Sequence, residues 1–114
     1  MITLSNIDPQ MIANNLDPST LYHPGELLAE ELEERGLTQT SLAQQLGISV
    51  SIVNEIIKGK RNISVEFAMM LEAALGIEAS LWINLQREYD LESAKANPTF
   101  VDRLAKIRRI AAVL

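Results

Sequence analysis

The sequence contains no cysteine and has few aromatic residues, few glycines and few prolines. The lack of cysteine excludes disulfides, thiolate metal sites and a cysteine nucleophile. No apolar run approaches the roughly 18 residues that a membrane-spanning helix needs. The opening residues, MITLSNIDPQM, lack the basic and apolar regions of a signal peptide. We therefore expect a globular, soluble and cytoplasmic protein with no membrane partner.

A catalytic apparatus is also missing from the sequence. His23 is the only histidine, and its place beside Pro24 at an expected helix start favours a structural role. The glutamate pairs at 30–31 and 33–34 lie on an expected exposed helix, with no histidine, cysteine or glycine-rich loop to complete a site. We expect no enzymatic activity, no metal and no cofactor.

Residues 39–61, QTSLAQQLGISVSIVNEIIKGKR, are typical of two short helices joined by a tight turn. Ala43 is small enough for the helices to cross closely, and Gly47 can adopt the positive φ that ends the first helix. Ser49 can cap the second helix. That helix would turn its apolar side inward and present its outer face to a DNA major groove. The outer face comprises Val50, Ser51, Asn54 and Lys58.

Charge is unevenly distributed along a chain with a net charge of −5 and a pI near 4.8. Residues 23–36 carry five glutamates against one arginine, whereas residues 38–63 carry three basic residues against one glutamate. Residues 99–114 carry four basic residues and one aspartate. A positive patch on an acidic body can still meet phosphate, so we expect weak, salt-sensitive nonspecific binding to DNA.

Apolar residues recur at helical spacing through most of the chain, and no segment predicts a strand. Residues 1–22 are interrupted by Pro9 and Pro18, so only residues 9–16 can form a short helix there. Further helices are predicted over residues 24–34, 39–46, 50–58, 64–75, 80–91 and 100–113, the last capped by Thr99. The predicted organisation is an irregular N-terminal segment (1–22), a helix-turn-helix domain with a dimerisation helix (23–92) and a C-terminal helical extension (93–114).

Three segments make the chain resemble a known family. They are HPGELL at 23–28, ISVSIVNEIIKGKRNIS at 48–64 and SLWINLQREYDLE at 80–92. All three are similar to the HigA-type antitoxin branch of the phage-repressor-like (XRE) helix-turn-helix family, and the WxNLQxxYDL pattern is the most specific. The resemblance implies an all-α, lambda-repressor-like bundle of about five helices plus a C-terminal helix.

The resemblance also implies a function. HigA-type antitoxins are dimeric transcriptional repressors that bind a palindromic operator in their own promoter. They also neutralise a cognate HigB-type toxin, a ribosome-dependent messenger-RNA endonuclease encoded beside them. The partners expected from the family are therefore double-stranded DNA, a toxin protein and a second copy of the chain.

The positions expected to contact DNA follow from the same resemblance. Gln39 would contact phosphate with help from the helix N-terminus, Asn54 would read a base edge, and the basic turn would clamp phosphates. The expected DNA-binding residues are Thr38, Gln39, Ser49, Val50, Ser51, Asn54, Lys58, Lys60 and Arg61. Relatives commonly carry arginine where this chain has Val50 and Ile52, which favours A/T-rich or shape-led recognition. Relatives also often carry arginine at Met70, where we expect an apolar contact instead.

Two regions leave alternatives open. Trp82, the only tryptophan, belongs either to the domain core or to a dimer seam on the helix that begins near residue 80. The expected seam residues are Leu81, Trp82, Leu85 and Tyr89, with polar contacts from Asn84 and Gln86. The last helix can close the protein's own core, extend a dimer interface, or hold a toxin or DNA backbone.

Two other functions fit the same sequence. The chain can be a free-standing XRE-type regulator with no toxin beside it. It can also be a protein-interaction module that keeps the fold but does not bind DNA. The acidic pI and the missing recognition arginines support this alternative. The acidic helix over residues 24–34 and the N-terminal segment are the better electrostatic matches to a basic toxin.

Overall fold

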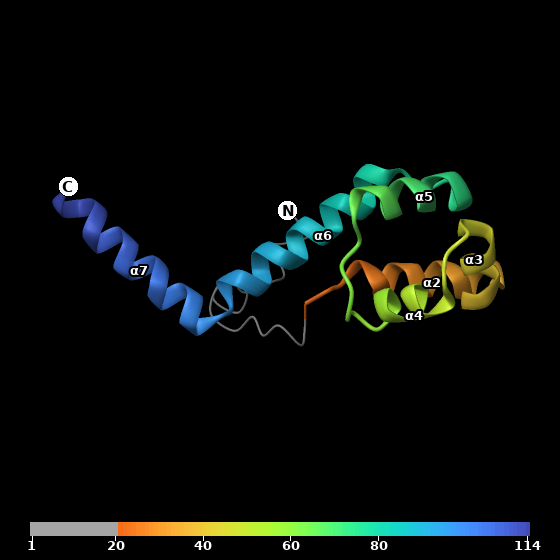
Figure 1. The fold of residues 1–114 in the computed structure, drawn as a ribbon, viewed down its shortest axis with the longest axis horizontal. Coiled ribbons are helices and arrows are strands. Elements are labelled where there is room, and N and C mark those ends of the chain that lie inside the picture. The colour runs from red at the N-terminus through yellow and green to blue at the C-terminus, as the bar shows by residue number, and fades with distance from the viewer. Residues whose placement is uncertain (1–20) are drawn as a thin grey trace, which may run out of the picture. The chain divides into compact units, whose positions relative to one another are not determined.

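The computed structural model describes residues 21–114, and all regular secondary structure in this range is helical (Figure 1). The helices are α2 (Pro24–Arg35), α3 (Gln39–Leu46), α4 (Val50–Ile57), α5 (Val65–Leu75), α6 (Ala79–Lys95) and α7 (Pro98–Val113). The all-α prediction is confirmed. The predictions for residues 1–20, including the short helix over 9–16, lie outside the described residues.

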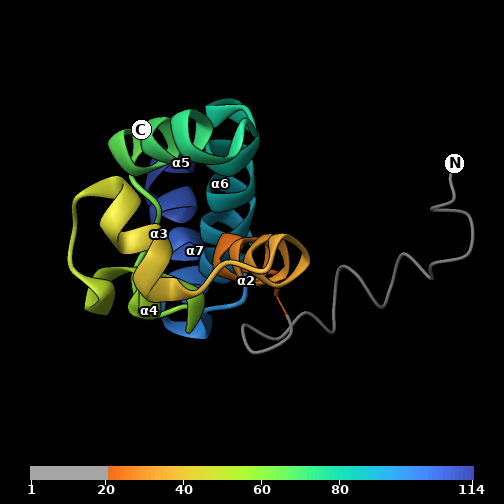
Figure 2. The ribbon, with the colours of Figure 1, turned by 90° about the vertical axis from the view of Figure 1, so that its right-hand side faces the viewer.

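The chain divides into two compact units. The first is Tyr22–Tyr89, and the described residues of the second are Leu21 and Asp90–Leu114. Within the first unit α5 lies on one side and α4 on the other, with α2 and α3 between them (Figures 1 and 2). Of the helices described, none is long and apolar enough to cross a membrane.

Local capping explains where the helices of the first unit begin and end. The Nδ1 atom of His23 accepts a hydrogen bond from the backbone N–H of Gly25 at 2.9 Å, and the backbone N–H of His23 donates to Glu26 Oε2 at 3.1 Å. These reciprocal bonds form a capping box at the start of α2. Gly47 closes α3 with a φ of 72°, which only glycine adopts at little cost. His23 is therefore structural, as predicted.

Two helix boundaries differ from the predictions by more than one residue. Helix α6 continues to Lys95, four residues beyond the predicted end, because nothing terminates it before Asn97 and Pro98. Helix α7 is capped by Asn97, whose side-chain oxygen accepts a hydrogen bond from the N–H of Phe100 at 3.2 Å. The prediction that Thr99 caps this helix is wrong, because Pro98 already fits the first helical position.

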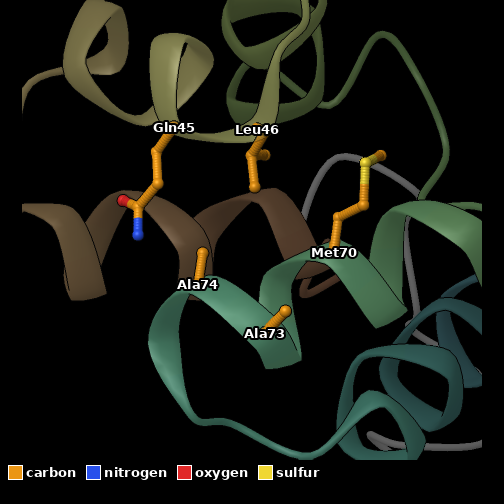
Figure 3. Close-up of a pocket in the computed structure, with 5 residues that line it drawn as sticks. All are labelled: Gln45, Leu46, Met70, Ala73 and Ala74. Carbon is orange, nitrogen blue, oxygen red and sulfur yellow. The ribbon is translucent and has the colours of Figure 1, made fainter.

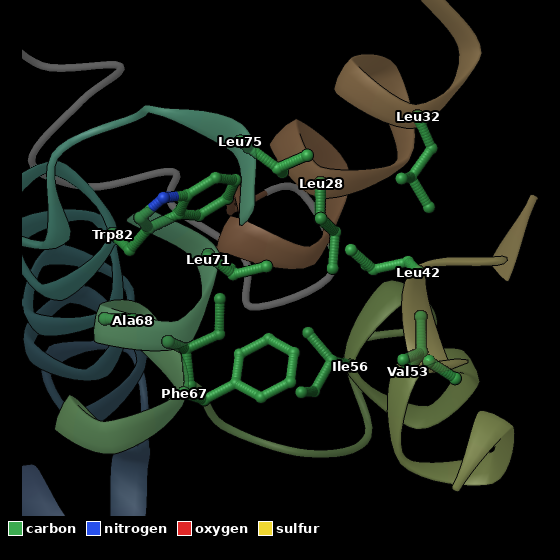
Figure 4. Close-up of a cluster of buried hydrophobic side chains, with 12 residues drawn as sticks. Leu28, Leu32, Leu42, Val53, Ile56, Phe67, Ala68, Leu71, Leu75 and Trp82 are labelled. Carbon is green, nitrogen blue, oxygen red and sulfur yellow. The ribbon is translucent and has the colours of Figure 1, made fainter. Parts of the chain in front are cut away.

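One hydrophobic core holds the first unit together (Figure 4). It draws on α2 to α6 and comprises Leu28, Leu32, Leu42, Ala43, Val53, Ile56, Ile63, Phe67, Ala68, Leu71, Leu75 and Trp82. Trp82 is completely buried in this core, so it presents no surface to a second copy of the chain. The core interpretation of Trp82 is the one that the structure supports.

The approach of α2 to α4 depends on a single glycine. A Cβ atom placed on Gly25 would overlap the backbone carbonyl of Ile56, near the end of α4. The HPG segment therefore does two things, since it caps α2 and lets that helix start directly against α4. This contact fixes the helix that is expected to enter DNA.

A hollow of about 230 Å³ lies between α3 and α5 (Figure 3). It is lined by Gln45, Leu46, Met70, Ala73 and Ala74. Met70 packs against the core with its neighbour Leu46. The predicted apolar contact at Met70 is confirmed.

Helix α7 differs from all the others because none of its residues is buried. Its apolar stripe includes Phe100 and Ile107, whose side chains are 41% and 54% exposed.

Candidate nucleic-acid interface

The helix-turn-helix is held by hydrogen bonds at both helix starts. Thr38 Oγ1 accepts a bond from the N–H of Ser41 at 3.0 Å, and Ser49 Oγ accepts one from the N–H of Ser51 at 3.1 Å. Between the helices, the N–H of Ile48 donates to the carbonyl of Ala43 at 3.0 Å. Thr38 and Ser49 therefore cap α3 and α4, and their hydroxyl hydrogens remain available as donors at the surface.

The outer face of α4 forms one wall of an open hollow of about 360 Å³. The residues that line it are Gln39, Val50, Ser51, Asn54 and Glu55. Val50 is 42% exposed, Ser51 is exposed and Asn54 is half-buried. The structure thus brings together four of the residues that were predicted to contact DNA.

A hydrogen bond joins the two amides of this hollow. Asn54 Nδ2 donates to Gln39 Oε1 at 3.0 Å, across 15 residues of sequence. The bond orients both side chains, leaving the Gln39 amide nitrogen and the Asn54 carbonyl oxygen available at the surface. An outward-facing donor at Gln39 and an oriented amide at Asn54 suit a phosphate contact and a base contact, respectively. The sequence predicted both residues but not the bond.

The basic turn that follows α4 is exposed. Lys58, Lys60 and Arg61 all lie at the surface, and Gly59 between them has a φ of 75°. Arg61 is already paired, since its Nε and Nη2 atoms lie 2.8 and 2.7 Å from Glu55 Oε1. Arg61 can therefore contact phosphate only with nitrogens that Glu55 does not engage.

Sequence reasoning missed Glu55 as part of this surface. Its position four residues after Ser51 places it on the same face of α4 as Ser51, and that spacing was the signal that could have found it. From the sequence alone, Glu55 entered the interpretation only through its contribution to the net charge of residues 38–63.

The same turn is anchored from behind by Gln86 on α6, whose side chain is 6% exposed. Gln86 Oε1 accepts a hydrogen bond from the N–H of Ile63 at 2.7 Å, and its Nε2 donates to Asn62 Oδ1 at 3.2 Å. The expectation that Gln86 makes contacts at a dimer seam is wrong, because its amide is used inside its own domain. The glutamine of the WxNLQxxYDL pattern thus supports the segment that follows the basic turn.

Tyr89 on α6 contacts the HPG segment. Its ring lies edge-on to that of His23, with centroids 4.8 Å apart and an angle of 79° between the rings. A Cβ on Gly59 would come within 3.7 Å of the His23 ring. Two of the three segments that carried the resemblance therefore meet behind the basic turn. Of the expected seam residues, Leu81 is 44% exposed, while Leu85 and Tyr89 are half-buried.

Comparisons with known proteins agree with this geometry. The family described as Helix-turn-helix matches residues 28–82. Virulence-associated protein I of Dichelobacter nodosus is 42% identical over 64% of this chain and 68% of its own length.

Two solved structures are also similar. One is an addiction module antidote protein of the HigA family from Coxiella burnetii, at 38% identity and a TM-score of 0.61 over 64% of this chain and 80% of that one. The other is the Pseudomonas aeruginosa antitoxin HigA, solved with the higBA promoter, at 39% identity and a TM-score of 0.64 over 66% of this chain and 83% of that one. Fold and family are those of a DNA-binding regulator and not of an enzyme. The chain belongs to the HigA-type antitoxins of the helix-turn-helix family.

Proposed function

We propose that this protein represses its own promoter by binding an operator there, and that it neutralises a HigB-type messenger-RNA endonuclease encoded beside it. The observation that carries the DNA-binding half is the oriented amide pair of Gln39 and Asn54 on the exposed face of α3 and α4. The similar antitoxin that was solved with its promoter supports DNA binding by this chain.

In this proposal α4 enters the major groove. Asn54 reads an adenine edge through its amide, and Val50 contacts a thymine methyl group. The Gln39 amide and the N-terminus of α3 bind a backbone phosphate. Lys58 and Lys60 add phosphate contacts that position the domain without reading sequence.

The operator is expected to be a palindrome read by a dimer. Helix-turn-helix dimers read half-sites roughly 34–36 Å apart, so the two copies must present their α4 helices on one side of the DNA. We infer that the exposed Leu81, together with Leu85 and Tyr89, contributes to the contact between copies. Trp82 stabilises that part of α6 from inside the core.

The toxin is expected to meet the acidic surface of α2. Glu30, Glu33 and Glu34 are exposed there. Burial raises the pKa of Tyr22 above its ordinary value of 10.0, and the carboxylates of Glu30 and Glu26 raise it further, as a local negative field must. Such a field accelerates encounter with a basic toxin.

Two experiments in cells separate the parts of this proposal. A reporter under the protein's own upstream region should be repressed by the wild type, which tests autorepression. Induction of the neighbouring reading frame should arrest growth, and co-expression of this protein should restore it. Repression without such a neighbour would identify a free-standing regulator.

A protein-interaction module remains the second candidate because one observation favours it. Glu55 offsets one of the three cations of the basic turn, on a chain whose net charge is already −5. No repression of the reporter, combined with restored growth, would support that function.

A further inference from the structure

Glu55 faces the same hollow as Val50, Ser51 and Asn54, although it is the only acidic residue of α4. Its side chain is 44% exposed. Glu55 follows Ser51 by four positions, so in a helix that lies in the major groove the two residues share a face, and Glu55 lines the hollow beside Asn54. DNA that reaches Asn54 therefore also meets the Glu55 carboxylate.

Arg61 fixes the position of this carboxylate. Both of its contacting nitrogens, Nε at 2.8 Å and Nη2 at 2.7 Å, lie against the single oxygen Oε1. The other oxygen, Oε2, has no hydrogen-bond partner among residues 21–114. The positive charge of Arg61 also offsets the repulsion between Glu55 and DNA phosphate. The pair thus presents one oriented acceptor to the groove.

An oriented carboxylate discriminates between base edges. Guanine offers two acceptors in the major groove and thymine offers one, so each repels it. Adenine offers a donor, but an acceptor nitrogen stands beside it. Cytosine is the one base whose own major-groove edge carries an amino donor, N4, and no acceptor, and glutamate is a recognised acceptor from that group.

We infer that Glu55 is a specificity-determining residue that selects cytosine at one base pair of each half-site, with Arg61 as its positioning residue. This inference rests on the proposed function, because it requires α4 to lie in the major groove. It changes the expected operator: the missing arginine at Val50 removes a guanine reader, but a G·C pair is read from its cytosine side. Recognition is then not restricted to A/T-rich sequence.

The test uses the full chain and the protein's own operator in a panel of duplexes, each with one base pair replaced. The wild type should prefer cytosine at one position per half-site by about 5- to 150-fold. Glu55→Gln should abolish that preference or move it to adenine, which an amide reads in a bidentate way. Preferences at all other positions should persist. Glu72→Gln, which removes the same charge from an exposed position on α5, is the matched control and should bind like the wild type.

Arg61→Ala distinguishes positioning from phosphate binding. If Arg61 positions Glu55, its loss should reduce the cytosine preference in the wild-type background and leave the preferences of the Glu55→Gln variant unchanged. If Arg61 only binds phosphate, its loss should weaken every duplex equally in both backgrounds, which would contradict the positioning role.

The result that overturns the inference is an identical pattern of base preferences in the wild type and Glu55→Gln. The operator would then still be bound selectively, and the proposed function would stand. A wild type with no preference at any position is a different result, because it removes the proposed function and this inference with it.

Discussion

Helices α4 and α7 show two ways in which the same chain makes a helix. Helix α4 has only 8 residues, yet Val53 and Ile56 are buried, Ser49 caps it, and the turn after it is anchored by Gln86. Helix α7 has 16 residues and none is buried. Isolated helices shorter than about 12–15 residues are marginal in water, so α4 depends on its packing. Helix α7 begins at its Asn97 cap and has one ion pair within the helix.

The difference between α4 and α7 indicates which helix is suited to hold functional side chains. The side chains proposed to face DNA lie on the short helix, whose buried residues Val53 and Ile56 fix its position in the domain. Helix α7 carries four basic residues and one aspartate but has only one ion pair within the helix, between Lys106 and Asp102 at 3.6 Å. An exposed pair of this kind contributes little to stability.

The largest expected effect is on stability and separates the two regions directly. Leu71→Ala removes a completely buried side chain and should lower the free energy of unfolding by about 2–5 kcal/mol. Ile107→Ala removes a side chain that is 54% exposed on α7 and should change it by less than about 0.5 kcal/mol. Chemical denaturation of both variants measures the difference. Equal losses would mean that α7 is packed after all.

The next effect is on DNA recognition. Asn54→Ala should cost about 1–3 kcal/mol of binding to the operator and relax the preference at one base pair. The reason is the loss of an amide that Gln39 holds in place at 3.0 Å. Competition binding with operator and random-sequence duplexes measures it. Equal losses on both duplexes would show that Asn54 does not read a base.

Gln86 connects the core to the surface that is proposed to bind DNA. Gln86→Met keeps the apolar bulk but leaves the N–H of Ile63 without its acceptor, which should cost about 1–3 kcal/mol of stability. Binding to every duplex should also weaken, because the segment after the basic turn loses its anchor. Gln45→Met, at an exposed position of α3, is the matched control for the change of side chain. Unchanged DNA binding by a destabilised Gln86→Met would restrict its role to folding.

The smallest effect concerns single phosphate contacts. Lys60→Ala should weaken operator and random DNA alike and lower the salt slope of binding by about one. Lys95→Ala removes an equal charge from the end of α6 and should leave the slope unchanged. Titrations at several salt concentrations give both slopes. An unaltered slope in Lys60→Ala would remove Lys60 from the interface.

The sequence predicted those features that depend on neighbouring residues. The bounds of α3, its Thr38 cap and the positive φ of Gly47 follow from residue type and helical period, and all are confirmed. The sequence did not decide whether Trp82 lies in the core or in a dimer seam, because a helical period shows that a residue is covered but not by which neighbour. The end of α6 was also missed, because no strong terminator marks the predicted end.

The contacts that organise the site join residues distant in sequence. The Gln39–Asn54 bond spans 15 residues, and the bond from Ile63 to Gln86 spans 23. The pairing of Glu55 with Arg61 crosses the basic turn. A single sequence assigns each of these polar residues to the surface or to the core, but it does not assign their partners. The sequence therefore predicted the positions of the candidate site, and the structure shows which of their side chains are hydrogen-bonded to one another.

The most direct test of the account is a titration of the purified protein onto fluorescent DNA from its own upstream region, beside a scrambled duplex, at two salt concentrations. We predict preferential binding to the upstream DNA with two protomers per site, a preference that survives the higher salt and is lost in Asn54→Ala. Equal, weak binding to both duplexes that vanishes as salt rises would contradict the account. The face of α3 and α4 would then be a scaffold that does not read DNA.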